Sequence, residues 1–204
     1  MPHDQDPRQW EDEIRAFESA DLRKAPPEHP ILFVGSSSIR FWRLKKFFPE
    51  HHKDCLNRGF GGSGLPDLLH HFDRLVTSYQ PHAVVLYSGE NDLGHGASVE
   101  SVVGNLKLVS SRILELVPPA RLLVLPVKPS PMLWSRWPEM QRVNEAIKEL
   151  AGQSRQLDTI DTATALLDGR GEPDDRFYMR DQLHLSQEAY LVWSELIRPW
   201  LEKE

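Results

Sequence analysis

The sequence predicts an α/β fold in which helix layers cover both faces of a parallel β-sheet. One observation is that short apolar runs, each long enough for a single strand, alternate along the chain with helix-like stretches. A second is that the strongest runs are apolar almost throughout, as in strands that are buried on both sides. With 204 residues and 40% hydrophobic content, the chain can bury a substantial core, so we expect one domain over residues 1–204.

Five stretches are the candidate strands. In chain order they are ILFV (31–34), CLN (55–57), AVVLY (83–87), RLLVL (121–125) and LDTID (157–161). CLN and LDTID are the weakest candidates because they contain the most polar residues. The stretches between the last three strands are long enough for helical crossovers, which parallel strands need.

Apolar residues at spacings that line one helical face predict the covering helices. For the two crossover helices these residues are Val99, Val102, Val103, Leu106, Ile113 and Leu116, and then Met140, Val143, Ile147 and Leu150. Two further helices lie near the chain ends, the first at about residues 7–21 and ended by Pro26 and Pro27. Their apolar stripes comprise Trp10, Ile14 and Phe17 in the first helix and Ala189, Trp193, Leu196 and Trp200 in the second. We expect the tryptophans of these stripes in the core.

Composition excludes several classes of partner. A formal charge of −6 leaves no broad basic face for a nucleic-acid backbone, and no segment approaches the ~18 consecutive apolar residues of a membrane span. The start of the chain is acidic and polar and does not read as a secretory signal. Cys55 is the only cysteine, so no internal disulfide can form, and these features together predict a cytoplasmic protein.

One short stretch, HHKDC, resembles a set of metal ligands. It places His51, His52 and Cys55 close together in sequence. A metal site needs three or four convergent ligands, and the only carboxylate in this stretch is Asp54. A solvated loop is the better interpretation, so we predict no metal site here.

The loops that follow the predicted strands are the candidates for function. In open parallel sheets, ligands bind beyond the carboxyl ends of the strands, near the point where the strand order reverses. The loops at these ends read GSSS (35–38), RGFGGSG (58–64), SGENDLGHG (88–96) and PVKPSPMLWSRWP (126–138). Each carries glycine or polar residues that a simple connection would not need.

The glycine-rich loop offers one alternative function, nucleotide or flavin binding. Gly59, Gly61 and Gly64 satisfy the pattern GxGxxG, and Glu90 follows the next strand as a possible ribose-binding acid. The match is weak, because the preceding DCLNR is mostly polar and the pattern belongs to the first strand-to-helix turn rather than the second. The better interpretation is that these glycines let backbone N–H groups approach a ligand, with Pro66 starting the next helix.

The serines of GSSS have two ordinary uses, as a helix N-cap and as a nucleophile. GSSS alone favours the cap. The segment RDQLHLS changes the balance, because it places Asp181 three residues before His184. A carboxylate there can accept a hydrogen bond from one imidazole nitrogen and hold the other toward a serine as general base. The alternative is a surface loop before a helix that Ser186 caps.

Four blocks together resemble the SGNH hydrolases, also called the GDSL esterase and lipase family. GSSS (35–38) is similar to the first block, NRGFGG (57–62) to the second, GEND (89–92) to the third and DQLH (181–184) to the last. Their order and spacing both fit, and the blocks span most of the chain. The resemblance implies a flavodoxin-like, three-layer α/β/α sandwich with a five-stranded parallel sheet, close to the fold expected from periodicity.

Residue by residue, the resemblance implies Ser37 as the nucleophile, Asp181 as the orienting acid and His184 as the base. It also implies an oxyanion hole formed by Ser37, Gly62 and Asn91. Acyl transfer by these groups proceeds through an acyl-enzyme and needs no metal or cofactor.

The chain departs from the family pattern at Ser36, where the more familiar motif carries Asp. A serine cannot supply the same charge, and Ser36 and Ser38 both stay candidates for the helix cap. Trp134 and Trp137, in the long loop at 126–138, are the candidates for a substrate wall because such loops usually carry specificity. Packing in the core is an equally weighted alternative for either one.

The leading functional hypothesis is a serine esterase that hydrolyses short-chain acyl or acetyl esters of a small molecule or saccharide. A lysophospholipase or thioesterase with the same site is the alternative within enzymes, and a nucleotide- or flavin-binding module is the alternative outside them. We expect the ester substrate as the partner, with no nucleic acid and no membrane. His70, His71 and His95 could border the pocket or lie on the surface, and we favour the surface.

Overall fold

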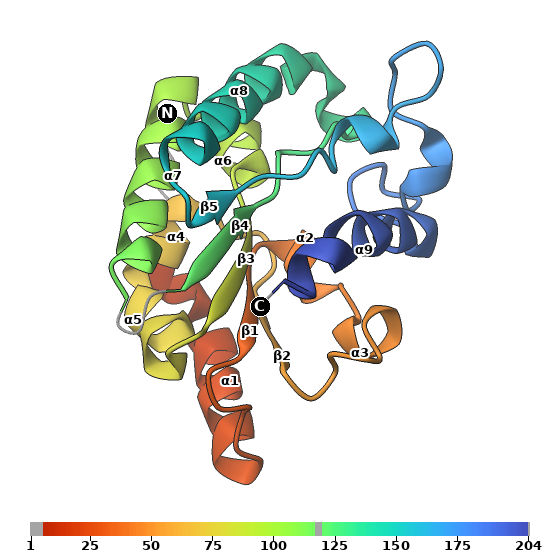
Figure 1. The fold of residues 1–204 in the computed structure, drawn as a ribbon. Helices are drawn as coiled ribbons and strands as arrows, with labels where there is room; N and C mark the ends of the chain where they lie inside the picture. The colour runs from red at the N-terminus through yellow and green to blue at the C-terminus, as the bar shows by residue number, and fades with distance from the viewer. Residues whose placement is uncertain (1–5, 117–119, 204) are drawn as a thin grey trace.

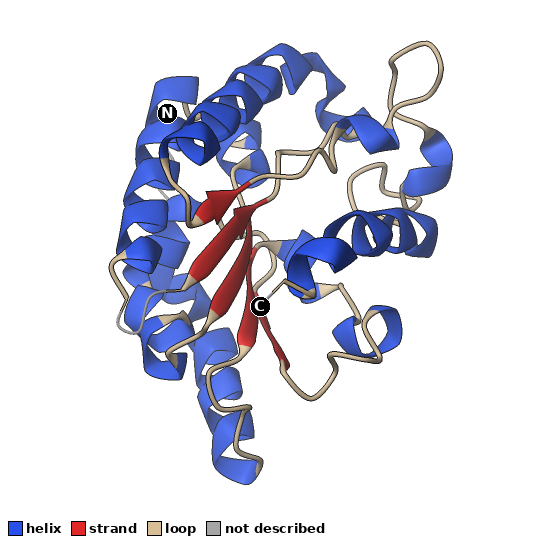
Figure 2. Cartoon of the chain, in the orientation of Figure 1, coloured by secondary structure: helices blue, strands red, loops and turns tan. Residues whose placement is uncertain are grey.

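A computed structural model describes residues 6–116 and 120–203, and its fold is the predicted three-layer α/β sandwich (Figure 1). Figure 2 shows the strands as one central sheet with helices on both sides. The first five residues of the polar N-terminal stretch lie outside the described residues. The parallel strands are β1 (Ile31–Gly35), β2 (Cys55–Gly59), β3 (Ala83–Tyr87), β4 (Arg121–Val124) and β5 (Leu157–Asp158).

The strand order is β2-β1-β3-β4-β5, which is the flavodoxin-like order. β2 is longer than the predicted CLN, because Arg58 and Gly59 stay in register with the end of β1. β5 is shorter than the predicted LDTID. The strand ends at Asp158. The side-chain hydroxyl of the next residue, Thr159, donates a hydrogen bond of 2.8 Å to the Val124 carbonyl of β4.

Helices cover the two faces of this sheet in two groups. The first group packs on one face and comprises η1 (Pro7–Trp10), α1 (Glu11–Arg23), α4 (Leu65–His70), α5 (Phe72–Leu75), α7 (Val99–Leu114) and α8 (Trp137–Gln153). The second group packs on the other face and comprises α2 (Ser37–Arg40), α3 (Leu44–Phe47) and α9 (Gln187–Leu201). The remaining elements are α6 (Glu90–Gly94), η2 (Thr77–Tyr79), η3 (Pro131–Arg136), η4 (Thr164–Leu166) and η5 (Asp175–Phe177).

The sheet separates two hydrophobic cores. Along β1, Leu32 and Val34 join the core under the first helix group, whereas Ile31 and Phe33 join the core under the second. This alternation follows from the period of two in a strand, and it explains why the predicted strands are apolar at nearly every position.

The terminal helices confirm most of the predicted apolar stripes. Trp10, Trp193 and Trp200 are buried, as predicted. Leu196, on the stripe predicted for the C-terminal helix, is 37% exposed. The surface position predicted for His71 is wrong: its ring is buried beside Phe60, and Nε2 lies 2.9 Å from the Pro7 carbonyl.

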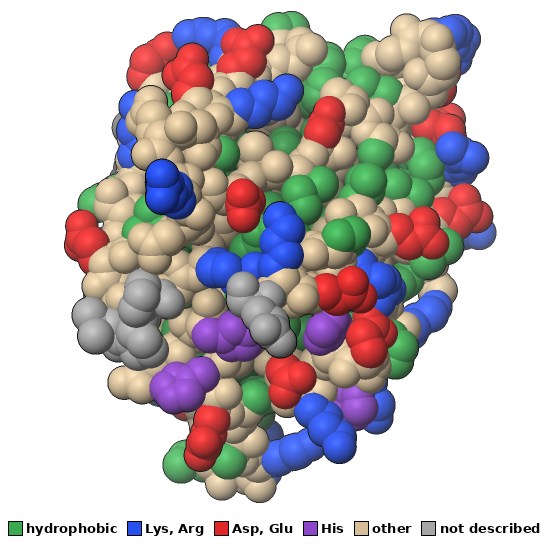
Figure 3. All heavy atoms as spheres, viewed as in Figure 1, with side chains coloured by type: hydrophobic (Ala, Val, Ile, Leu, Met, Phe, Trp, Pro, Cys, Tyr) green, Lys and Arg blue, Asp and Glu red, His purple; other side chains and the backbone are tan. Residues whose placement is uncertain are grey.

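Acidic and basic side chains are interspersed on the face of the molecule in Figure 3. No helix of residues 6–116 and 120–203 has the length and apolar character needed to cross a membrane. Within the same residues, no three His, Cys, Asp or Glu side chains come together as metal ligands.

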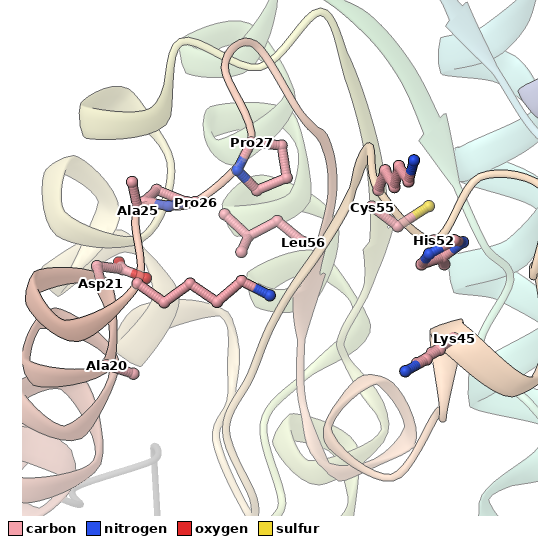
Figure 4. Close-up of a pocket in the computed structure, with 11 residues that line it drawn as sticks. Ala20, Asp21, Ala25, Pro26, Pro27, Lys45, His52, Cys55 and Leu56 are labelled. Carbon is pink, nitrogen blue, oxygen red and sulfur yellow. The ribbon is translucent and has the colours of Figure 1, made fainter.

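A cavity of about 650 Å³ lies between the end of α1, the segment before β1 and the start of β2 (Figure 4). Cys55 lines it, and burial raises the pKa of this thiol to about 12, which keeps it protonated and unreactive at neutral pH. The cavity lies at the amino ends of β1 and β2. None of the predicted site residues lines it.

Candidate active site

The register of the sheet places the ends of three strands side by side, together with the candidate functional loops that follow them. Gly35, at the end of β1, pairs with Gly59 at the end of β2 and with Tyr87 at the end of β3. The strand order reverses between β1 and β3, which is where open α/β sheets bind ligands. The loops after β1, β2 and β3 therefore meet at the expected place.

Two glycines make the turn from β1 into α2 possible. Gly35 has φ +139°, and a Cβ atom on it would lie 1.8 Å from the Tyr87 carbonyl oxygen. A Cβ atom on Gly59 would lie 2.2 Å from the backbone nitrogen of Arg40 in α2. Both positions therefore need glycine for a close backbone approach, which sets α2 directly against the ends of β2 and β3.

The three serines of this turn differ in their surroundings. Ser36 is the N-cap residue of α2 by its backbone, although its side chain makes no capping hydrogen bond. The carbonyl of Ser38 accepts a hydrogen bond of 2.9 Å from the Tyr190 hydroxyl. Ser37 is 9% exposed, against 3% for each neighbour, and its Oγ bonds to none of the described residues. Ser37 is thus the most accessible of the three.

Asp181 and His184 form a hydrogen-bonded pair within one turn. His184 Nδ1 lies 2.6 Å from Asp181 Oδ2, and Asp181 Oδ1 accepts the amides of Leu183 at 3.0 Å and His184 at 2.9 Å. Burial works to raise the pKa of Asp181, but the bonds from His184 and Leu183 outweigh it and lower this pKa to about 2. The ionised carboxylate favours the Nδ1–H tautomer, which leaves Nε2 of His184 free to accept a proton.

The turn that carries this pair has a strained residue at its centre. Gln182 adopts φ +58°, in the left-handed region that only a few non-glycine residues occupy. Its amide donates to the Met179 carbonyl at 2.9 Å, and its carbonyl accepts from the Met132 amide at 3.0 Å. These two bonds tie the turn to its own flank and to η3.

Phe41 connects the turn of GSSS to His184. The Phe41 ring meets the His184 ring edge-on, with ring centroids 5.1 Å apart. The Phe41 amide donates to the Ser37 carbonyl at 2.9 Å, so the two residues stand one helical turn apart on the same side of α2. The structure therefore places the end of the helix that begins at Ser37 beside the His184 ring.

The predicted oxyanion donors also lie on adjoining loops. Asn91 Nδ2 donates to the Ser63 carbonyl at 2.9 Å, which joins α6 to the loop that carries Gly62. A side-chain amide has two N–H groups, so one stays available to a ligand. Gly62 has φ +77°, with open space where a Cβ would point. The backbone amides of Ser37 and Gly62 donate no hydrogen bond to any of the described residues.

Trp134 and Trp137 lie together but are mostly turned to the core. Their rings stack with centroids 5.8 Å apart. Trp137 is 8% exposed and belongs to the core of the first helix group, whereas Trp134 is half-buried and packs against that core. Trp134 offers the larger surface to a substrate, and the role of both as a substrate wall stays a prediction.

Sequence reasoning missed two features of this region. The first is a set of exposed apolar side chains on segments that contact the DQLH turn, namely Phe41, Met132 and Met179. Isolated apolar residues have no periodic signal that would reveal them. Glu90, considered above only as a ribose-binding acid, instead forms a buried ion pair with Lys128. A lysine within the mostly apolar segment after β4, at LPVKP, was the signal that could have pointed to it.

Comparisons with known proteins identify the family of the chain. Residues 40–192 match the sequence profile of the GDSL-like Lipase/Acylhydrolase family. The platelet-activating factor acetylhydrolase IB subunit alpha1 of Pongo abelii is 34% identical over 182 residues, which are 84% of this chain and 74% of that protein. The human protein of the same name is 33% identical with the same coverage.

Solved structures share the fold at lower identity. A GDSL-like lipase from Bacteroides thetaiotaomicron superposes with a TM-score of 0.80 at 19% identity, over 93% of this chain and 97% of that one. An acetyl xylan esterase from Geobacillus stearothermophilus superposes with a TM-score of 0.69 at 15% identity, over 88% and 97%. With most of its length matched by the family profile and relatives above 30% identity, the chain belongs to the GDSL-like lipase/acylhydrolase family and is an ester-hydrolysing enzyme.

Proposed function

We propose that this enzyme hydrolyses short-chain acyl or acetyl esters of a small molecule or saccharide through Ser37, His184 and Asp181. The observation that carries the proposal is the Asp181–His184 pair, at 2.6 Å, beside the helix that begins at Ser37, the most accessible of the three GSSS serines. The family profile begins at residue 40, so the role of Ser37 rests on this geometry and on the GSSS resemblance.

The reaction starts with attack of Ser37 Oγ on the ester carbonyl carbon while His184 Nε2 takes the hydroxyl proton. The carbonyl oxygen becomes an oxyanion, and the amides of Ser37 and Gly62 and the side chain of Asn91 donate hydrogen bonds to it. His184 then gives its proton to the departing alcohol as the carbon–oxygen bond breaks, leaving an acyl group on Ser37.

Water completes the cycle. His184 Nε2 takes a proton from the water molecule, whose oxygen attacks the acyl carbon, and the same proton returns to Ser37 Oγ as the acid is released. Throughout, Asp181 stays ionised and holds the ring, which its pKa of about 2 permits. These steps call on no metal or cofactor.

Short acyl groups are proposed because the loops around the site are polar and rich in glycine, as in NRGFGGSG and SGENDLGHG. The relatives named platelet-activating factor acetylhydrolase fit an acetyl preference. A saccharide alcohol stays within the proposal because Trp134 keeps an aromatic surface near η3, and such surfaces suit sugar rings. We also propose that the enzyme works in the cytoplasm, because its lone cysteine needs no oxidising compartment.

The experiment is a series of p-nitrophenyl esters with acyl chains from short to long, each measured below its aggregation limit. kcat/KM should be highest for acetyl to butyryl esters. A maximum for long acyl chains would contradict the short-acyl proposal and favour the lysophospholipase or thioesterase alternative. Acetylated sugars in the same panel test the saccharide alcohol, and acetyl thioesters test the thioesterase alternative.

A further inference from the structure

A buried ion pair lies directly against the turn that carries the proposed catalytic pair. Lys128 and Glu90 are 1% and 5% exposed at their side chains, and Lys128 Nζ lies 2.6 Å from Glu90 Oε1 and 2.7 Å from Oε2. Lys128 follows β4, and Glu90 is the first residue of α6. The pair therefore connects two of the loops at the carboxyl edge of the sheet.

The ammonium group has a third acceptor, the carbonyl of Leu183, at 2.8 Å. Leu183 lies between Asp181 and His184 in the DQLH turn. An ammonium group has three N–H donors, so the two carboxylate oxygens and this carbonyl can use all of them. Lys128 thus bonds a peptide group next to His184 while it holds Glu90.

The other end of the pair leads to the oxyanion loop. Glu90 directly precedes Asn91, whose side chain bonds the Ser63 carbonyl. Glu90 Oε2 also lies 3.2 Å from the Tyr87 hydroxyl, which adds a bond to the end of β3. Through Glu90, Lys128 therefore links the His184 turn to the helical turn that presents Asn91.

Stability alone is a poor explanation for this arrangement. Burying two charges is costly, and apolar residues of similar volume often stabilise a core as well or better. Burial lowers the pKa of Lys128, and contact with Glu90 opposes that shift. The pair is better explained by what it holds in place, because the DQLH turn itself is partly exposed and contains the strained Gln182.

We propose that the Lys128–Glu90 pair is a positioning device that fixes the peptide beside His184 relative to the turn that carries Asn91. Base and oxyanion donor then keep the spacing that the transition state needs. Neither Lys128 nor Glu90 contacts the reacting atoms, so both are positioning residues. The inference rests on the proposed function, in which His184 is the base and Asn91 an oxyanion donor.

The test uses the double variant K128M/E90Q, which removes both charges, keeps the length of the Glu90 side chain and shortens the Lys128 side chain by one atom. The single variant K128M would strand the Glu90 carboxylate in the core and can unfold the protein. We expect the double variant to keep its circular dichroism spectrum and a cooperative thermal transition. Its kcat for p-nitrophenyl acetate should fall about 10²-fold, the cost of a small misplacement of reacting groups, while KM changes little.

The matched control neutralises a second ion pair, in which the arginine is buried. Arg58 bonds Asp21 at 2.5 Å and joins β2 to α1, away from the DQLH turn. The variant R58M/D21N should lose stability and keep the wild-type kcat. A parallel loss of kcat in this control would show that general loosening, not positioning, lowers the rate.

Two further measurements keep the inference falsifiable. The variant E90Q keeps one oxygen acceptor for Lys128 but removes the counter-charge of its buried ammonium, so its kcat is measured below its own thermal transition. There its kcat should lie between the wild type and the double variant. The downfield proton resonance of the His184 ring bonded to Asp181 should weaken in K128M/E90Q and persist in R58M/D21N. Wild-type kcat and an unchanged resonance in K128M/E90Q would overturn the inference.

The failure of the inference can be told apart from the failure of the proposed function. If Ser37→Ala abolishes hydrolysis while K128M/E90Q stays fully active, only the positioning role is wrong. If Ser37→Ala keeps full activity, the proposed mechanism itself fails, and the positioning role that depends on it fails too.

Discussion

Replacing Asn91 with alanine separates transition-state stabilisation from folding stability. The Asn91 side chain has two N–H groups, of which one bonds the Ser63 carbonyl at 2.9 Å. In the proposed mechanism the other bonds the oxyanion, a contact that the substrate carbonyl makes only weakly. Asn91→Ala should therefore lower kcat much more than it changes KM.

Asn91→Ala should lose more transition-state stabilisation than folding stability. Removing one oxyanion donor typically costs about 2.7–4 kcal/mol of transition-state stabilisation, which lowers kcat by about 10²–10³. Losing the bond to Ser63 costs about 0.5–1.5 kcal/mol of folding free energy. For a chain of this size, each kcal/mol lowers Tm by about 2–4 °C, so the fold should persist at assay temperature.

Tyr79→Phe is the matched control. The Tyr79 hydroxyl donates to Asp21 Oδ2 at 2.6 Å and accepts from Arg58 Nε at 2.8 Å, on an element that precedes β3. The control should lose stability comparable to or greater than Asn91→Ala, because its partners are charged. Its kcat should stay at the wild-type value.

The assay is steady-state hydrolysis of p-nitrophenyl acetate, together with thermal unfolding of each variant. An Asn91→Ala enzyme with unchanged kcat would remove Asn91 from the oxyanion hole. Equal falls of kcat in Asn91→Ala and Tyr79→Phe would show that kcat follows stability, which would refute the reasoning.

Three further predictions address the acid and the turn. Asp181→Asn should lower kcat by up to about 10⁴ in a steady-state assay, because the amide favours the wrong tautomer of His184. The pKa of Asp181 is lowered from 3.8 to about 2, so its ionised form adds stability above pH 4 that is lost as the pH falls toward 2. The urea unfolding midpoints of the wild type and Asp181→Asn should therefore converge as the pH falls over that range. Gly35→Ala should cost at least about 3 kcal/mol in urea unfolding, because its Cβ meets the Tyr87 carbonyl, whereas Gly96→Ala, with open space and φ +87°, should cost about 1 kcal/mol.

The sequence could predict the sheet because its strands are buried on both faces. Continuous apolar runs such as ILFV and AVVLY carry that signal directly, and β3 lies where AVVLY places it. β5 was overestimated because Thr159 and Ile160 resemble strand residues locally. The bond from the Thr159 side chain to the Val124 carbonyl is a tertiary contact that local sequence does not encode.

The proximity of Asp181 and His184 could be predicted from their spacing, since three residues fit one turn. Local sequence patterns could not predict contacts between segments that are distant in the sequence. The edge-on contact of Phe41 with His184, and the bond from Lys128 to the Leu183 carbonyl, join residues more than 50 positions apart in sequence. Burial of a loop residue was also beyond local patterns. The loop position of Trp137 suggested a substrate wall, but its ring belongs to a core.

The choice of nucleophile among Ser36, Ser37 and Ser38 is the central claim, and one measurement tests it directly. The enzyme is treated with a fluorophosphonate, whose phosphorus is attacked by an activated serine with loss of fluoride, and the modified peptide is sequenced by mass spectrometry. We predict a single adduct on Ser37 that is absent from the His184→Ala variant. An adduct on Ser36 or Ser38, or none in an enzyme that hydrolyses p-nitrophenyl acetate, would contradict the account.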